Sequence, residues 1–415
     1  MAEGGRRWAL ARICMVAYTD YAADQRIRRE AEALVARGDI VDLICPRSKA
    51  LEGMTSLKGV NLQFVRRFQQ KRKAGPIRYL ARYATFVVGA AARVSRLNRA
   101  NRIDLVEVHT MPDFLVFAAW PAKRRGAGVI LDVHDLVPEL YESKFGLRAG
   151  HPIVRFLTWI ERRSIAFADA ALAVHRPHRD AIVRHGTPVE KLTEVMNSPD
   201  LGVVGPPQVE AEIDPSLVVY HGTIATRHGL EWAVRAIDLA RRDGRDTTLF
   251  IAGDGDDAGR IEDLIVELGL EDAVTFQRRL VMLEELIPKL RRAQVGVIPL
   301  VPDSFTRYML PVKLLEYAAL RIPVVVTRTS TIEAYFDDSC VAFVDPEDPE
   351  AIAREIADIA RDSNRRQAMT TNAAKVVARH SWEEERKRYL AVVDEVLRKS
   401  HATVVAGDRV QVEAR

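Results

Sequence analysis

The stretch from Leu310 to Val326 reads LPVKLLEYAALRIPVVV, and it combines a helix with a buried strand. Pro311 suits the first position of a helix, where a missing N–H costs nothing. Pro323 ends that helix, and the apolar run 324–326 then predicts a strand that is covered on both faces. Because a helix followed at once by a fully apolar strand is typical of a parallel sheet, the stretch indicates an α/β fold.

The same alternation of strands and helices extends through the rest of the chain. In the first half we expect strands at 13–18, 41–45, 104–109, 129–133, 170–174 and 195–196, and helices at 25–37, 114–124 and 153–168. In the second half we expect strands at 217–220, 248–252, 274–276, 295–298, 324–326 and 341–343, with helices at 230–241, 258–268 and 284–292 and two more beginning at Pro349 and Trp382. This repetition predicts two doubly wound, Rossmann-like domains.

The length of 415 residues also favours two domains. We expect the linker at 201–213, where glycines and prolines interrupt the alternation. The first domain then spans 1–200 and the second 214–380. A C-terminal helix at 381–400 is expected to pack back towards the first domain, and a loose tail follows at 401–415. Because doubly wound sheets bind ligands beyond the carboxyl ends of their strands, we expect the site in a cleft between the two facing domains.

Several classes of protein are disfavoured by the composition. The three cysteines are far apart and match no zinc spacing, which suits a reducing cytoplasm. Arg12 interrupts the N-terminal apolar run, so we recognise no signal peptide. No apolar run approaches the roughly 18–20 residues of a membrane span. No GxGxxG follows a strand, which removes the main support for a nicotinamide cofactor. We expect a cytoplasmic protein that is soluble or attached to the surface of a membrane.

The segment 66–102 carries a run of basic residues that no Asp or Glu interrupts. Aromatic and apolar side chains alternate with the basic ones, and Arg78 and Arg82, like Arg93 and Arg96, have helical spacing. Such a basic amphipathic stretch suits an anionic membrane surface, most of all on the cytoplasmic face. A solvated helix face is the second interpretation, and nucleic acid is the least favoured of the three.

Lys313 lies in the first turn of the helix in the opening stretch, where the macrodipole disfavours a cation. An anion bound at the helix N-terminus would account for this lysine. Glu316, one turn later, can accept hydrogen bonds from hydroxyl groups beside that anion. A phosphate flanked by hydroxyls describes a nucleotide sugar. A solvated helix face explains the two residues equally well, so both interpretations stay open on these residues alone.

Short motifs elsewhere in the chain point to one family. They are DQR at 24–26, VH at 108–109, DVHDLVPE at 132–139, MNSPD at 196–200, YHGT at 220–223, RHG at 227–229, IAGDG at 251–255 and the block 311–323. In this order and spacing the chain resembles the large family of retaining glycosyltransferases that includes bacterial mannosyl- and glucosyltransferases and sucrose synthase, over roughly residues 13–397. The resemblance implies the two-domain GT-B fold. It also implies a metal-independent transfer of a hexose from a nucleotide diphosphate sugar to an acceptor hydroxyl, without a cofactor.

The resemblance also implies roles for particular residues. Glu316 would hold the ribose hydroxyls, and His134 would contact the donor sugar, so these two are the candidate catalytic residues. From the residues themselves we assign the diphosphate charge to Arg227 and Lys313, and Gly222 either lets the backbone approach the phosphates or is an ordinary turn glycine. Further candidates, which lie at the acceptor or fix the loops beside it, are Asp24, Arg26, His109, Glu139 and Asn197.

Two positions depart from the family pattern. Tyr308 stands where many members carry a first glutamate eight residues before Glu316, and His228 replaces a phosphate-binding lysine. We expect a lipid-linked or cell-surface glycan as the acceptor. Two rival functions stay open, a nucleotide-sugar 2-epimerase and a degenerate, non-catalytic subunit that binds a nucleotide sugar. The sequence does not determine the base, the sugar, the acceptor or the oligomeric state.

Overall fold

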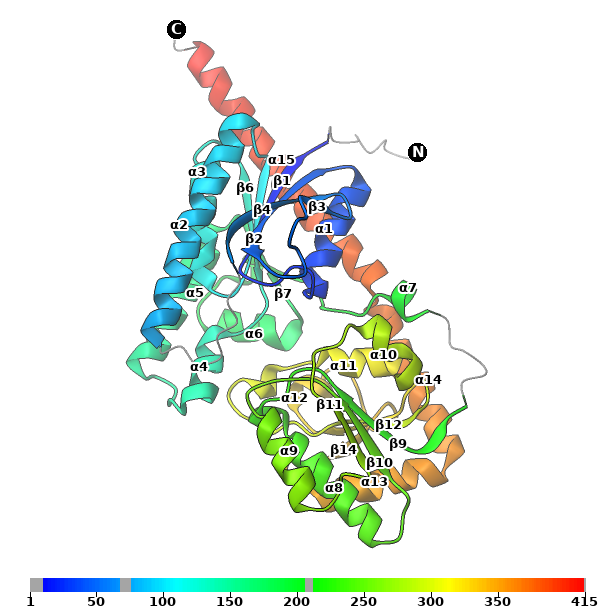
Figure 1. Ribbon diagram of the computed structural model, residues 1–415. Coiled ribbons are helices and arrows are strands. Elements are labelled where there is room, and N and C mark those ends of the chain that lie inside the picture. The colour runs from blue at the N-terminus through cyan, green and yellow to red at the C-terminus, as the bar shows by residue number, and fades with distance from the viewer. Residues whose placement is uncertain (1–9, 68–75, 206–211, 414–415) are drawn as a thin grey trace, which may run out of the picture. The chain divides into compact units, whose positions relative to one another are not determined.

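The computed structural model describes residues 10–67, 76–205 and 212–413 of the chain (Figure 1). It forms two compact units, Met1–Met196 together with Arg386–Arg415, and Asn197–Glu385. The C-terminal segment from Arg386 therefore belongs to the first unit. The two units are described separately below.

The sheet of the first unit has eight strands in the order β3-β4-β2-β1-β5-β6-β7-β8. All neighbours are parallel except β3 and β4, which are antiparallel. The strands are β1 (Arg12–Ala17), β2 (Ile40–Arg47), β3 (Ser56–Leu57), β4 (Val60–Arg67), β5 (Leu105–His109), β6 (Gly128–Val133), β7 (Ala170–Ala173) and β8 (Leu192–Glu194).

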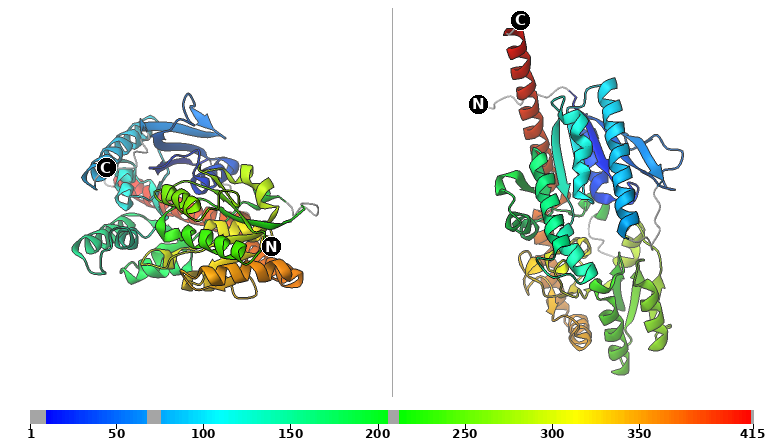
Figure 2. Two further views of the ribbon diagram at one scale, coloured as in Figure 1. Left: turned by 60° about the horizontal axis from the view of Figure 1, so that its bottom comes forward. Right: turned by 90° about the vertical axis from the view of Figure 1, so that its left-hand side faces the viewer.

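Helices cover both faces of this sheet. Figure 1 shows α2, α3 and α5 to the left of the sheet and α1 and α15 to its right, and the second view of Figure 2 brings α2 and α5 to the front. The helices are α1 (Gln25–Arg37), α2 (Pro76–Ala100), α3 (Trp120–Lys123), α4 (Val137–Phe145), α5 (Pro152–Phe167), α6 (Arg176–Arg184) and α15 (Trp382–Glu413), with 3-10 turns η1 (Asp113–Ala119) and η2 (Val189–Lys191).

The second unit contains a fully parallel six-stranded sheet in the order β11-β10-β9-β12-β13-β14. Its strands are β9 (Asp214–His221), β10 (Thr248–Ala252), β11 (Val274–Gln277), β12 (Ala293–Ile298), β13 (Val324–Thr327) and β14 (Ala342–Val344). Its helices are α7 (Leu201–Val204), α8 (Leu230–Arg242), α9 (Ala258–Glu267), α10 (Leu283–Leu290), α11 (Val312–Ala319), α12 (Ser330–Glu333), α13 (Pro349–Arg361) and α14 (Ser363–Arg379), with 3-10 turns η3 (Thr226–His228) and η4 (Thr306–Tyr308).

The strand order reverses once in each sheet, between β1 and β5 in the first unit and between β9 and β12 in the second. At such a switch point the loops after the two neighbouring strands diverge, which leaves room for side chains to gather. The predicted α/β class with two doubly wound sheets is confirmed, and the candidates His109 and Gly222 lie at the carboxyl ends of strands β5 and β9 beside these switch points.

Several predicted elements differ from the structure. The helix expected at 114–124 is the 3-10 turn η1 followed by the short α3, because Pro121 cannot donate the N–H that a continuous helix needs. The strand expected at 195–196 is β8, three residues earlier. Pro311 is the N-cap of α11 and not its first residue. The elements not assigned by pattern include the strands β3 and β4 and the helices α2, α4, α6 and α14.

The ends of the expected domains also differ. The linker region 201–213 contains the short helix α7, and the tail expected to be loose at 401–415 is helical as far as Glu413, since no proline interrupts α15. Ala414 and Arg415 lie outside the described residues, as do Lys71, Arg72 and Lys73 of the predicted basic stretch. None of the described helices is long and apolar enough to cross a bilayer.

Candidate functional site

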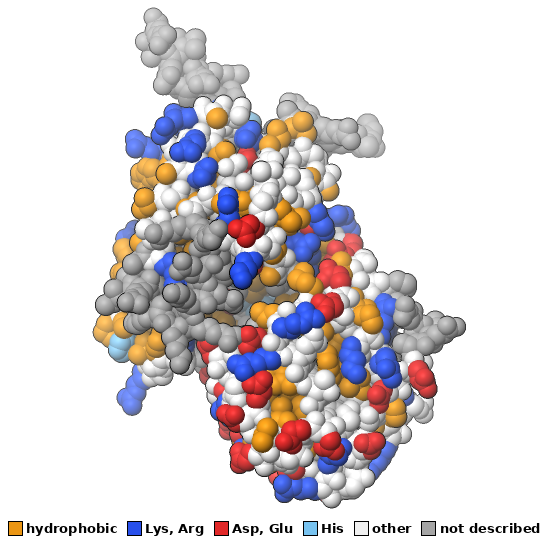
Figure 3. Space-filling model, in the orientation of Figure 1, with side chains coloured by type: hydrophobic (Ala, Val, Ile, Leu, Met, Phe, Trp, Pro, Cys, Tyr) orange, Lys and Arg blue, Asp and Glu red, His pale blue; other side chains and the backbone are white. Residues whose placement is uncertain are grey.

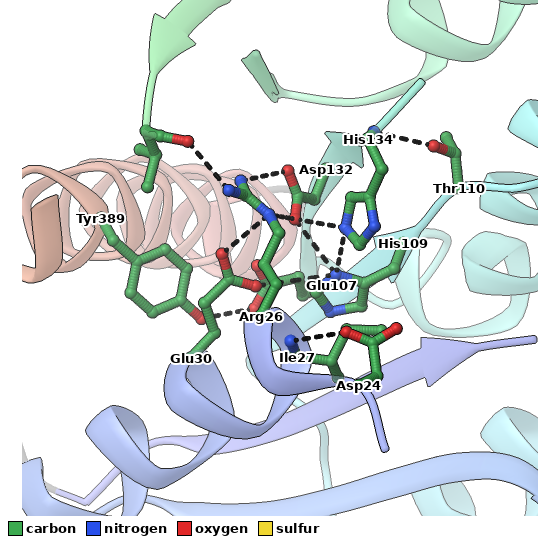
Figure 4. Close-up of polar contacts among 11 residues, drawn as sticks. Asp24, Arg26, Ile27, Glu30, Glu107, His109, Thr110, Asp132, His134 and Tyr389 are labelled. Carbon is green, nitrogen blue, oxygen red and sulfur yellow. Dashed lines mark hydrogen bonds and ion pairs between the residues drawn. The ribbon is translucent and has the colours of Figure 1, made fainter. Parts of the chain in front are cut away.

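Two clusters of polar side chains lie at the switch points, one in each unit. The first, which we call the histidine cluster, consists of His109, Asp132, His134 and Arg26 (Figure 4). Strand β5 ends at His109, β6 carries Asp132 and His134 follows it, so parallel pairing places the three side chains together. Asp132 Oδ2 lies 2.7 Å from His134 Nε2 and 3.2 Å from His109 Nδ1.

Arg26 fixes the carboxylate at the centre of this cluster. Its Nε and Nη2 donate to the two oxygens of Asp132 at 2.7 Å each, and its Nη1 donates to the carbonyl of Val195 at 2.9 Å. The side chain is only 5% exposed. Arg26, which the sequence offered as an acceptor contact, therefore positions Asp132, and Asp132 in turn positions His134.

The charges of the histidine cluster follow from this arrangement. Burial alone would raise the pKa of Asp132, but the charge of Arg26 and the two histidines outweigh it and hold the pKa well below its usual range. Burial would likewise lower the pKa of His134, yet the adjacent Asp132 carboxylate raises it. His134 thus favours its protonated form and makes no hydrogen bond through Nδ1 to any described residue.

Two buried carboxylates lie behind the histidine cluster. Glu30 of α1 and Glu107 of β5 are fully buried, and burial raises the pKa of both. Tyr389 of α15 donates its hydroxyl to Glu107 Oε2 at 2.6 Å. Their raised pKa values favour protonated, neutral carboxyl groups, which reduces the repulsion within this acidic interior.

Two of these groupings have the donor types of a metal site. One is His109, Asp132 and His134, and the other is Glu30, Glu107 and His109, each with ligand atoms within 4.8 Å of one another. The sequence analysis did not predict that these acidic residues lie close to one another. In the first grouping Arg26 already hydrogen-bonds both oxygens of Asp132, so a cation would have to displace a guanidinium. The first grouping therefore fits an ion-paired network better than a metal.

Asp24 and Glu139, the other predicted residues of the first unit, take structural positions. Asp24 is the N-cap of α1 and accepts from the N–H of Ile27. Glu139 of α4 lies 3.0 Å from His185, whose other ring nitrogen lies 2.7 Å from Glu161 of α5. These hydrogen bonds outweigh burial and raise the pKa of His185 to about 10. The charged histidine ties α4 to α5. Asn197 is the first residue of the second unit.

The second cluster, which we call the lysine cluster, consists of Gly222, Arg227, Lys313, Glu316 and His221. Lys313 Nζ lies 3.7 Å from the centre of the Tyr220 ring and makes no hydrogen bond or ion pair with a described residue. Burial lowers the pKa of Lys313 to about 7 against the pull of Glu316. Gly222 has a φ of 106°, which a side chain would strain, and a Cβ there would lie 3.5 Å from Lys313 Nζ.

Arg227 is a second cation in the lysine cluster, and it has no anionic partner among the described residues. Its guanidinium lies 5.6 Å from the centre of the Phe305 ring, and its buried Nε has no hydrogen-bond partner. The neighbouring His228 donates from Nδ1 to the carbonyl of Thr223 at 2.8 Å. Burial, together with the charge of Lys313, lowers the pKa of His228 to about 4. His228 is therefore neutral and cannot replace the charge of a lysine.

Glu316 is oriented by a histidine that the sequence did not single out. His221 Nε2 lies 2.7 Å from Glu316 Oε2, and its Nδ1 lies 3.0 Å from the hydroxyl of Tyr317. Glu316 is 6% exposed, and Oε1 has no partner among the residues the structure describes. One signal could have identified His221, since it is a polar residue directly after the apolar run 217–220 at the carboxyl end of β9.

The glycines after β10 support the loop that carries Gly222. A Cβ at Gly253 would lie 2.0 Å from the carbonyl oxygen of Gly222, and one at Gly255 would lie 1.9 Å from that of Ile224. Both positions thus require glycine for close backbone packing. Tyr308 closes the turn η4, half-buried, with the guanidinium of Arg307 4.9 Å from its ring centre. It supplies no carboxylate.

Comparison with known families gives matches in both halves of the chain. The family described as "Glycosyl transferase 4-like domain" matches residues 22–198, and the family described as "Glycosyl transferases group 1" matches residues 215–362. The chain belongs to the group 1 glycosyltransferases. The family resemblance drawn from the short motifs is thereby confirmed.

Individual relatives agree with this family. The chain is 27% identical over 262 residues to the alpha-D-kanosaminyltransferase of Streptomyces kanamyceticus, a match that covers 59% of the chain and 66% of that protein. It is 26% identical over 336 residues to the D-inositol 3-phosphate glycosyltransferase of Thermobispora bispora, covering 76% of each.

Solved structures resemble the whole fold of this group 1 glycosyltransferase. Sucrose-phosphate synthase from Thermosynechococcus elongatus superimposes with a TM-score of 0.73 at 16% identity, over 94% of the chain and 100% of that structure. Anabaena HepE in complex with UDP gives a TM-score of 0.70 at 13% identity, over 92% and 100%. The expected GT-B fold is confirmed by these neighbours.

Proposed function

We propose that the protein transfers a hexose from a nucleoside diphosphate sugar to an acceptor hydroxyl, with retention of the anomeric configuration and without a metal. The observation that carries this proposal is in the lysine cluster. Lys313 and Arg227 are two cations without an anionic partner among the described residues, and Lys313 lies near enough to the Glu316 carboxylate for that charge to raise its pKa against burial. A diphosphate attached to a ribose supplies the missing anion and the hydroxyls together.

The N-terminus of α11 adds a third source of positive potential. No side chain caps this helix, so its first N–H groups and its dipole are available to an anion. In the proposed reaction the bond from the sugar to the diphosphate breaks while positive charge develops on the ring. Lys313, Arg227 and the helix terminus then stabilise the negative charge that collects on the leaving diphosphate.

The histidine cluster is proposed to act on the sugar. His134 would donate a hydrogen bond to the sugar. Asp132 already holds its Nε2 and favours the protonated ring, so the other ring nitrogen carries an N–H that is directed elsewhere. The acceptor hydroxyl attacks the anomeric carbon on the face that the diphosphate leaves, and its proton passes to the departing phosphate oxygen. No side chain is needed as a nucleophile in this scheme.

The donor and acceptor are proposed from chemistry and from relatives. HepE, a structural neighbour, was solved in complex with UDP and glucose, so UDP is the first probe to use here. We retain a lipid-linked or cell-surface glycan as the proposed acceptor. The sequence-predicted site residues of both clusters keep their proposed roles except Arg26, which positions Asp132.

A single substitution tests the proposal. Replacing Glu316 by Ala should lower sugar transfer by at least about 100-fold and weaken UDP binding by about tenfold, since a carboxylate that accepts ribose hydroxyls is lost. Isothermal titration and a transfer assay over a panel of nucleotide sugars and acceptors measure both effects. Glu350→Ala, an exposed glutamate of α13, is the matched control and should change neither.

The outcome also separates the rival functions. Conversion of a nucleotide sugar without any acceptor would indicate an epimerase. UDP binding without turnover over the whole panel would indicate a binding subunit. Transfer and UDP binding that stay unchanged in Glu316→Ala would refute the assignment of the lysine cluster to the donor.

A further inference from the structure

The outer face of α5 exposes three large apolar side chains in a row. Ile153, Phe156 and Trp159 are 48%, 58% and 51% exposed. Their spacing of three residues places them on one side of the helix, and the rings of Phe156 and Trp159 stack with their centres 5.9 Å apart. Side chains of this size and kind are normally buried in a protein that has only water as its neighbour.

Basic residues flank this apolar row without acidic partners. Arg155, Arg162 and Arg163 are exposed residues of the same helix, and none forms an ion pair with a described carboxylate. The guanidinium of Arg163 lies 5.7 Å from the centre of the Trp159 ring. The single acidic residue of α5, Glu161, is 1% exposed and is bonded to His185, so it does not offset these charges at the surface.

A cavity opens beside Trp159. It has a volume of about 430 Å³ and is lined by Arg162, Arg163 and Lys191, with Trp159 on its apolar side. Lys191 is held there by hydrogen bonds from Nζ to the carbonyls of Ala168 and Ala166, at 2.6 and 3.2 Å. The lining also includes Thr187, which is 5% exposed and whose hydroxyl has no hydrogen-bond partner.

We propose that this face of the first unit binds the surface of an anionic phospholipid bilayer, with a lipid phosphate in the cavity. Ile153, Phe156 and Trp159 would lie among the headgroups and upper acyl chains, where aromatic rings are favoured. Arg162, Arg163 and Lys191 would contact the phosphate, and Arg155 would contact further anionic headgroups. The positive charge of these residues is complementary to the negative lipid phosphates, and this complementarity favours an anionic bilayer as the binding partner.

The surroundings of α5 support this surface. Figure 3 shows hydrophobic and basic side chains next to each other along the left-hand edge of the first unit, where Figure 1 places α4. Phe145, at the end of α4, is 50% exposed beside Lys144, whose ammonium lies 5.9 Å from the ring centre. The apolar and basic character thus extends from α5 to the next helix.

This surface differs from the one predicted at 66–102. Part of that stretch lies outside the described residues, and Arg93 donates to the carbonyl of Phe64 and is engaged within the fold. Arg96 and Arg99 of α2 are exposed and remain available to a membrane. The two surfaces can be distinguished by mutation. Each contains a pair of exposed arginines that can be replaced without changing the other surface.

The test is sedimentation of the full chain with vesicles of phosphatidylcholine containing about one third phosphatidylglycerol. Phe156→Ser with Trp159→Ser, and separately Arg162→Gln with Arg163→Gln, should each weaken vesicle binding by at least about tenfold. Arg96→Gln with Arg99→Gln removes the same charge from α2 and should change binding by less than about twofold. Thermal unfolding should show that all three variants stay folded, since every replaced side chain is exposed.

Several results would overturn the inference. One is equal loss in the α2 control, which would place the membrane surface on the sequence-predicted stretch. Another is equal binding to vesicles of phosphatidylcholine alone. A third is saturable binding of inorganic phosphate that needs Arg162 and Arg163 in a protein that binds no vesicles, because the cavity would then serve a soluble phosphate compound. UDP titration of the same variants keeps this result separate from the proposed function, since the lysine cluster is untouched.

Discussion

At the scale of single residues, Lys313 is the most unusual group in the second unit. An ammonium ion next to an aromatic face gains from the ring quadrupole, but burial without a hydrogen bond costs more than that gain. The result is a pKa of about 7, far below that of an exposed lysine. A bound diphosphate would reverse the balance, because its charge favours the protonated ammonium.

Donor binding should therefore depend on pH. Below about pH 7 Lys313 is already charged in the unbound protein, and above it each binding event must take up a proton. We expect the affinity for UDP to fall by about tenfold per pH unit between about pH 7.5 and 9.5, where the terminal phosphate of UDP is fully ionised. Isothermal titration in buffers of different ionisation enthalpy measures the affinity and the proton uptake together.

A conservative substitution provides the control for this pH dependence. In Lys313→Arg the guanidinium stays protonated over the whole range, so the affinity for UDP should become nearly constant. If the unmodified protein shows the same affinity at both ends of the pH range, then Lys313 does not contact the diphosphate in the way proposed.

The sequence predicts the residues of the lysine cluster better than their interactions. Lys313 and Glu316 could be identified because they lie in the first two turns of a helix whose ends are marked by Pro311 and Pro323. The contact between His221 and Glu316 joins residues 95 positions apart and could not be read from spacing. In the same way, Arg26 and Asp132 are paired across 106 positions, so a motif residue that looked like a ligand contact proved to be a buried ion-pair partner.

At the scale of helices and strands, local rules predicted regular segments and failed at irregular ones. Helix α1 was predicted to the residue, since its apolar periodicity ends at Gly38, which takes the left-handed conformation of a C-cap. The segment that contains η1 failed because its apolar residues suggest a helix while Pro121 interrupts the hydrogen bonding. Strand β4, which pairs with β2 on one side and with the two-residue edge strand β3 on the other, was not assigned, since polar residues alternate with apolar ones along its first half.

The C-terminal helix α15 offers a prediction at this scale. Its Tyr389 is fully buried and donates to the buried carboxyl of Glu107, while Asp394 pairs with Arg37 of α1 at 2.6 Å. Tyr389→Phe leaves Glu107 without this donor in an apolar setting, so we expect a loss of about 1–3 kcal/mol in the free energy of unfolding. Chemical denaturation measures the loss.

A second tyrosine shows whether the effect comes from the lost hydrogen bond. Tyr141→Phe removes a hydroxyl from a half-buried ring of α4 and should change the free energy of unfolding by less than about 0.5 kcal/mol. Equal effects of the two substitutions would mean that the hydroxyl of Tyr389 does not anchor α15 to the first sheet.

At the scale of the whole molecule, the two clusters belong to different compact units, and their chemistry is different. The lysine cluster has uncompensated cations and an oriented carboxylate, which suit the recognition of a nucleotide. The histidine cluster is an ion-paired network that favours a protonated His134. Under the proposed function the second unit would bind the leaving group and the first would contact the sugar, so substitutions in the two units should affect these two steps separately.

This separation leads to a prediction about the complete reaction. Lys313→Ala should raise the dissociation constant of UDP by about tenfold or more, because a charge-assisted contact to phosphate is lost. His134→Ala should leave that constant within about twofold but lower transfer by about 100-fold, as expected for a group that acts on the sugar and not on the nucleotide.

Chelation with EDTA should leave both quantities unchanged in the unmodified protein, since Arg26 occupies the carboxylate that a cation would need. If His134→Ala abolished UDP binding, or if chelation stopped transfer, the division of roles between the two units would be wrong.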